Sequence, residues 1–127
     1  MGLEPGLSAR VTLTVTEADT AQALGSGDVP VLATPRLLAL AEAATVRATA
    51  RHLPTGTTTV GTRVELEHLS ATPVGGSVSV EATLSTVDGR RLGFTVTGYD
   101  GETVAARGTV QRILVDRERF VSKAVNR

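Results

Sequence analysis

Cysteine is absent from the 127-residue sequence, so the chain has neither disulfide bonds nor thiol chemistry. Aromatic side chains are scarce, with two phenylalanines, one tyrosine and no tryptophan. A hydrophobic core must therefore be built from Val, Leu, Ile, Ala and Thr. The 13 basic and 13 acidic residues cancel, and no basic block is present, which argues against nucleic acid as a partner. The length predicts a single domain that spans residues 1–127.

The sequence also lacks a long uninterrupted hydrophobic run. The most apolar stretch, residues 37–46, has Arg36 before it, Glu42 within it and Arg47 after it, whereas a membrane span needs about 20 apolar residues. The N-terminal segment does not combine a positively charged start with an apolar core, as a secretory signal does. We therefore expect a cytoplasmic protein with no membrane partner.

The chain is organised around one predicted helix, which starts at Thr34-Pro35 and runs to about residue 50. A threonine hydroxyl can cap free backbone amides, and proline at the first helical position loses no needed donor. Because residues 37–46 are almost wholly apolar, this helix has no broad solvent face and is expected to be surrounded by other structure. Glu42 is the exception, since a carboxylate in such a helix is costly unless it is paired, hydrogen-bonded or functional.

The rest of the sequence follows a period of two, which predicts strands. Residues 17–24 are an exception and predict a short helix, with Thr16 as a possible cap. Asp88-Gly89 and Asp100-Gly101 are strong hairpin signals. The predicted strands are residues 10–16, 57–69, 77–87, 91–99 and 103–115.

The order of strand, helix and then four strands joined mainly by hairpins predicts an α+β fold. An antiparallel sheet of about five strands wrapped around one long central helix is the hotdog fold, which is our prediction. Such a sheet has edge strands to protect, and edge-to-edge pairing in a two-fold dimer is one way to protect them. We therefore expect a homodimer.

His68 is the first candidate for chemistry. It shares a strand face with Val64 and Leu66, the face expected to meet the helix. A lone histidine on an apolar face is usually a satisfied core residue. Its position at the end of a strand, before the loop at residues 70–73, favours function because loops at strand ends line clefts.

Glu42 and Thr34 are the other two candidates, and each also has a structural explanation. Glu42 could form a salt bridge with Arg47 or Arg63, and Thr34 could simply be a helix cap. Eight helical residues rise about 12 Å, so Thr34 and Glu42 of one helix cannot hydrogen-bond each other. If both serve one site, they act on different parts of it or one comes from a partner subunit, as a dimer-interface cleft would allow.

Several stretches of the sequence resemble the fluoroacetyl-CoA thioesterase-like family of hotdog proteins, and the resemblance covers most of the chain. They are Ala33-Thr34, Glu42 eight residues later, HLSATPVG at 68–75, DGRRL at 88–92 and Arg119-Phe120.

The resemblance implies hydrolysis of an acyl-CoA thioester with Thr34, Glu42 and His68 as the catalytic set. It implies no cofactor, since coenzyme A is part of the substrate. The fluoroacetate-specific enzyme has lid phenylalanines just before the threonine, whereas residues 25–33 contain no aromatic side chain. We therefore expect a different short-chain acyl group.

The chemistry of a thioester suggests roles for these residues. His68, with an ordinary pKa of about 6.5, suits a general base or acid. Glu42 could stabilise the imidazolium or attack the thioester itself, and Thr34 could position substrate or water. Amides at the start of the helix could hold the oxyanion.

Two other functions fit a hotdog protein. A non-catalytic module that binds acyl-CoA or a small apolar ligand would lack the acid or the base, and both are present here. A hydratase or dehydratase would carry a D-x-x-x-x-H pattern at the start of the helical segment, where no histidine is found.

Overall fold

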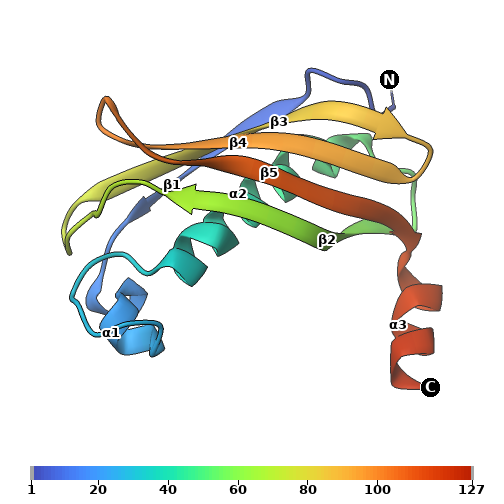
Figure 1. Cartoon of the computed structure of the whole chain (residues 1–127). Helices are drawn as coiled ribbons and strands as arrows, with labels where there is room; N and C mark the ends of the chain where they lie inside the picture. The colour runs from blue at the N-terminus through green and yellow to red at the C-terminus, as the bar shows by residue number, and fades with distance from the viewer. Residues whose placement is uncertain (1, 127) are drawn as a thin grey trace.

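The protein, analysed as a computed structural model that describes residues 2–126, is a curved antiparallel sheet around one long helix (Figure 1). The five strands lie in the order β1-β3-β4-β5-β2. The predicted five-stranded antiparallel architecture is therefore confirmed. The elements are β1 (Ser8–Thr14), η1 (Glu17–Asp19), α1 (Ala21–Leu24), α2 (Thr34–Thr49), η2 (Ala50–His52), β2 (Thr57–His68), β3 (Ser77–Asp88), β4 (Arg91–Asp100), β5 (Thr103–Asp116) and α3 (Arg117–Val125).

The hydrophobic core lies between α2 and the concave face of the sheet. Alternate residues of each strand point inward, as the period of two predicts, and they meet the apolar stripe of α2. Phe94, at the middle of β4, is the largest fully buried side chain. Core residues include Val11, Leu37, Leu40, Ala44, Val78, Val80, Leu84, Leu92, Phe94, Val96 and Val110. Each large apolar side chain stabilises the fold by about 1.5–3 kcal/mol on burial.

Two local expectations for the helices are wrong. The segment predicted as one helix over residues 17–24 is two short pieces, η1 and α1, because Thr20 is extended between them and caps α1 through its side chain. In addition, α2 is not covered on all sides within one protomer. Ala39, Ala43 and Val46 are exposed along one face of the helix.

The two edges of the sheet differ in length. β1 has seven residues, whereas β2 has 12 and pairs with β5 alone in the described part of the chain. A bulge at Thr62 interrupts the register between Gly61 and Arg63. A long edge strand with free backbone groups is a template for pairing with another strand.

The C-terminal helix α3 is an element that the sequence pattern did not predict. The Asp116 side chain caps it by accepting a hydrogen bond from the Arg119 amide at 2.9 Å. In Figure 1, α3 extends away from the sheet on the side that α2 covers.

Candidate functional site

Thr34 and His68, 34 residues apart in sequence, are in direct contact. Thr34 Oγ1 lies 2.8 Å from His68 Nδ1 in a hydrogen bond between the start of α2 and the end of β2. The prediction that Thr34 caps the helix is wrong, because its backbone is already helical and Ala33 is the N-cap residue. The Ala33 carbonyl accepts the first helical hydrogen bond, from the Leu37 amide at 3.0 Å. The threonine hydroxyl is thus directed to the imidazole instead of to the helix amides.

The other ring nitrogen of His68 has no partner. Nε2 is buried and lacks a hydrogen bond to any residue in the described range 2–126. Leaving a buried polar atom unpaired costs about 1–3 kcal/mol, so such an atom calls for an explanation such as a catalytic role. Burial lowers the pKa of His68 from its ordinary 6.5, and a smaller influence of the Ser70 backbone opposes this shift. The ring is therefore neutral at pH 7, with Nε2 free to exchange a proton.

Glu42 lies in a second location, where a buried arginine holds it. Arg112 Nη1 donates to Glu42 Oε2 at 3.1 Å, and the side chains are 7% and 36% exposed, respectively. The same guanidinium donates from Nε to Thr59 Oγ1 at 2.9 Å and from Nη2 to the Thr59 carbonyl at 3.0 Å. Burial lowers the pKa of Arg112, and the negative charge of Glu42 opposes that shift. Oε1 of Glu42 has no hydrogen-bond partner in the part of the chain that the structure describes.

The expectation that Glu42 forms a salt bridge with Arg47 or Arg63 is therefore wrong. Arg63 bonds Glu65 instead, at 3.0 Å and in solvent. Arg112 was overlooked because it lies 70 residues from Glu42 in sequence. One signal was available: Arg112 lies two residues after Val110 on β5 and therefore occupies an inward position of the strand.

One protomer does not bring Glu42 to the Thr34–His68 pair. A Cβ atom added at Gly61 would collide with Glu42 Oε2, which places the carboxylate against that point of β2. His68 is seven residues further along the same strand. At about 3.3 Å per residue, the two positions are roughly 20 Å apart. Both groups nevertheless lie along the helix-facing side of the edge strand.

A second arginine fixes the start of α2. Arg36 Nε donates to Asp19 Oδ1 at 2.9 Å, and the Ala33 amide donates to the Asp19 carbonyl at 2.9 Å. Asp19 Oδ2 accepts from both the amide and the hydroxyl of Thr16. The Thr16 amide, helped by Arg36, holds the pKa of Asp19 below its ordinary value against the effect of burial. These contacts hold η1 against the helix turn that carries Thr34.

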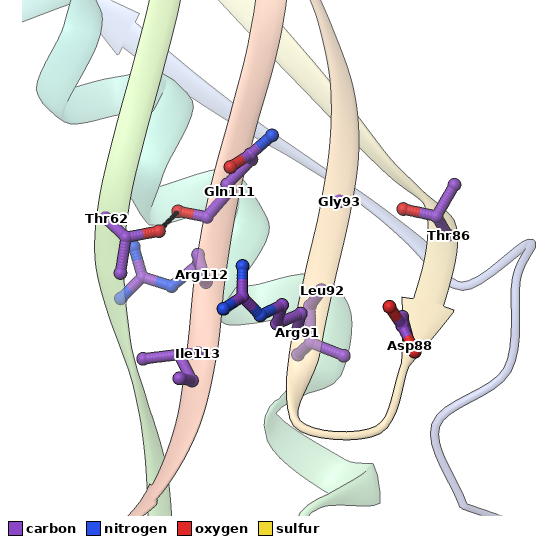
Figure 2. A pocket seen from close by; sticks show the side chains of 9 residues that line it. All are labelled: Thr62, Thr86, Asp88, Arg91, Leu92, Gly93, Gln111, Arg112 and Ile113. Atoms are coloured by element: carbon purple, nitrogen blue, oxygen red, sulfur yellow. Dashed lines mark hydrogen bonds between the residues drawn. The ribbon is translucent and has the colours of Figure 1, made fainter.

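A pocket of the sheet contains none of the three predicted site residues. It has a volume of about 450 Å³ and opens on the face away from α2 (Figure 2). Its lining is Thr62, Thr86, Asp88, Arg91, Leu92, Gly93, Gln111, Arg112 and Ile113. Gly93 leaves a gap there, since an added Cβ would meet Thr86 Oγ1.

Gly61 and Gly93 allow a matched test of the Glu42 position. Gly61→Ala is expected to push the Glu42 carboxylate away from its present place and to lower by about tenfold the kcat of a reaction that uses this carboxylate, since small displacements of a reacting group are costly. Gly93→Ala makes an equivalent collision with a side-chain oxygen on the outer face and is expected to keep its activity. Steady-state kinetics and thermal melts of both variants check this. Equal activities would show that the position of Glu42 does not matter.

Within residues 2–126, no three or more His, Cys, Asp or Glu side chains gather in a way that could hold a metal ion. No helix in the same range is both long and apolar enough to cross a membrane.

Comparison of the sequence with known proteins identifies relatives of this chain. The sequence model of the family described as fluoroacetyl-CoA-specific thioesterase matches residues 15–118. A fluoroacetyl-CoA thioesterase from Streptantibioticus cattleyicolor is 40% identical over 93 residues, which are 73% of this chain and 67% of that protein.

Solved structures agree with the sequence comparison. A structure of the fluoroacetyl-CoA thioesterase FlK superposes with a TM-score of 0.92 at 32% identity and covers 100% of this chain and 98% of its own. A hot-dog-like protein from Thermanaerovibrio acidaminovorans has a TM-score of 0.86 at 22% identity, over 94% and 89% of the two chains, which supports the hotdog fold alone. The chain therefore belongs to the fluoroacetyl-CoA-specific thioesterase family, whose hotdog fold and thioester hydrolase class it shares.

Proposed function

We propose that the protein hydrolyses a short-chain acyl-CoA thioester with Thr34, His68 and Glu42, in a cleft between two copies of the chain. The observation that carries the proposal is the hydrogen bond between Thr34 Oγ1 and His68 Nδ1, together with a buried Nε2 that has no partner among residues 2–126. A single domain over residues 1–127 and a cytoplasmic location complete the proposal.

The second copy is needed because Gly61, against which the Glu42 carboxylate lies, and His68 are roughly 20 Å apart along β2. Antiparallel pairing of two β2 strands about a two-fold axis near Val64 brings the Gly61 end of one strand beside the His68 end of the other. Glu42 of one protomer then lies near His68 of its partner. The unpaired β2 edge and the exposed apolar face of α2 both favour this dimer.

The proposed chemistry uses the neutral imidazole as a general base. With Nδ1–H donating to Thr34 Oγ1, His68 Nε2 takes a proton from water while the water oxygen bonds to the thioester carbonyl carbon. The negative charge of Glu42 stabilises the imidazolium that forms, and Arg112 keeps that carboxylate in place. The C–S bond then breaks, and the imidazolium returns the proton to the thiolate. Water and side chains suffice, so no cofactor is required.

The acyl group is proposed to be short and not specifically fluoroacetyl. Residues 25–33, which lead into α2, contribute Val29, Pro30, Val31 and Leu32 but no aromatic side chain. A panel of short acyl-CoA esters that includes fluoroacetyl-CoA tests this choice. Release of free thiol also distinguishes hydrolysis from binding alone.

Mixing two inactive variants tests the shared site. His68→Ala and Glu42→Ala homodimers each lack one group at both sites, so both are expected to be nearly inactive. In a randomly exchanged equal mixture, half the dimers are mixed and each has one complete site, so about a quarter of wild-type activity is expected.

The same mixture has two informative alternative outcomes. Activity no greater than the average of the two homodimers would contradict a site shared between subunits. Homodimers with near wild-type activity would show that these residues do not carry the reaction. A mixture of His52→Ala and Glu42→Ala is the reference for the assay: His52 has no proposed role, so this mixture is expected to keep about half of wild-type activity whether or not subunits exchange.

A further inference from the structure

Within the described residues 2–126, the side chains of the C-terminal helix α3 are not covered by the rest of the protomer. Each of its nine residues is exposed, including Phe120, Val121 and Val125 at 43%, 54% and 73%. A helix of this length is marginal in water by itself and normally depends on packing of its apolar side. A surface for α3 must therefore come from outside the protomer.

The position of α3 places it next to the proposed dimer interface. The Arg117 amide donates to the Gly56 carbonyl at 3.0 Å, and Asp116 pairs with Thr57, the first residue of the edge strand β2. The helix leaves the sheet on the side that carries α2 (Figure 1). It thus starts where an antiparallel partner strand would end.

A second group of exposed apolar side chains lies at the opposite end of β2, around His68. Leu69 follows His68 directly, and Val31 bridges to Pro73 next to Val74. This group, called here the His68-end patch, consists of Leu24, Val29, Leu69 and Val74. Two-fold pairing of β2 strands exchanges the two ends, so it brings α3 of one copy to the His68-end patch of the other.

We infer that α3 packs on the partner copy's His68-end patch and that Phe120 forms one wall of the site that contains the partner's Thr34 and the partner's His68. The inference rests on the β2 pairing in the proposed function and extends it, because each site then depends on the C-terminal helix of the other chain. The occupant of the exposed helix face is a second copy of this chain.

Charge favours the same pairing. Arg117, Arg119 and Lys123 exceed the single acidic residue Glu118 on α3, so the helix carries a net charge of about +2. The segment beside the His68-end patch carries exposed Glu17 and Asp28. Opposite charges around an apolar centre are typical of a specific interface.

Spin labelling tests the contact without relying on activity. The chain has no cysteine, so Val121→Cys gives a single attachment site on α3. Labelled protein at natural isotope abundance is mixed with ¹⁵N-labelled, unmodified protein, so that broadened amide signals report only contacts between chains. Broadening at residues 28–30 and 69–75 is expected.

A second label separates this inference from the dimer itself. Glu65→Cys places the label on the outer face of β2, near the proposed two-fold axis. If this label broadens the β2 amides of the other chain while the Val121 label leaves residues 28–30 and 69–75 sharp, the inference about α3 is overturned and the dimer stands. If neither label affects the other chain, both proposals fail.

Mixed dimers test the role of Phe120 in the site. When His68→Ala is mixed with Glu42→Ala, the complete site takes both Glu42 and α3 from the His68→Ala chain. Adding Phe120→Ala to that chain is expected to raise the KM for acyl-CoA by about tenfold, whereas adding it to the Glu42→Ala chain is expected to change nothing. The same change in KM, whichever of the two chains carries Phe120→Ala, would overturn the inference.

Discussion

Replacement of His68 by alanine is expected to lower kcat for thioester hydrolysis by about 10²- to 10⁴-fold, the usual contribution of a general base. The free energy of unfolding is expected to change by less than about 1 kcal/mol. The Thr34 hydroxyl, which loses its hydrogen-bond partner, is exposed and can bond to water. Removing the unpaired Nε2 offsets the packing that is lost with the ring.

His52, the other histidine of the chain, provides the matched control for this variant. It lies in η2, beyond the far end of α2 from Thr34, so His52→Ala is expected to keep wild-type kinetics. Thiol release measured for both variants checks the prediction. A His68→Ala enzyme within threefold of wild-type kcat would contradict the assignment of the base.

The lowered pKa of His68 predicts the direction of the pH dependence. Because the base must be neutral, kcat/KM is expected to fall on the acid side with a midpoint below 6.5. The unfolded chain takes up this proton more readily than the folded one. The contribution of the neutral His68 ring to the free energy of unfolding is therefore fully present above pH 6.5 and is lost as the pH falls through the folded-state pKa. Urea unfolding from pH 5 to 8 is expected to show this loss in wild type and not in His68→Gln.

Glu42→Gln is expected to lower kcat by about 10²-fold. The amide keeps the shape of the side chain but removes the charge that is proposed to stabilise the imidazolium. Arg112 remains bonded to Thr59 but loses its counter-charge, which we expect to cost about 1 kcal/mol, a small value because Glu42 is partly exposed.

The change in kcat, not the change in stability, distinguishes a catalytic role of Glu42 from a structural one. Glu81→Gln is the control, since Glu81 also pairs with an arginine, Arg10, at 3.6 Å on the surface of the sheet. Both variants are expected to fold, and Glu42→Gln alone is expected to be slow. If Glu42→Gln loses stability but retains its kcat, the carboxylate serves only as the partner of Arg112.

The fold was largely predictable because its signals are local. Alternation on each strand and the Asp-Gly hairpins depend on residues that are close in sequence, so their pattern survives in the chain alone. The bounds of β3, β4 and β5 differ from the predicted ones by at most one residue at either end. Helix α3 was not predicted, because its apolar residues form no buried face within the described residues 2–126.

The site was only partly predictable, because its contacts join distant parts of the chain. The sequence and its resemblance to a known family singled out Thr34, Glu42 and His68, but not how they are arranged. Only the tertiary structure decided that the Thr34 hydroxyl turns to His68 instead of capping its helix. Only the tertiary structure likewise revealed Arg112 as the partner of Glu42.

The sequence alone thus determined the order of the elements, the apolar face of each strand and the three candidate residues. These follow from backbone periodicity and side-chain chemistry, which act over a few residues. The tertiary structure decided which candidates meet within a protomer and which lie apart. The sheet register sets how far along β2 each one lies, with about 20 Å between His68 and Gly61, where the Glu42 carboxylate lies. That separation is the physical reason why one chain holds the imidazole and the carboxylate in different places.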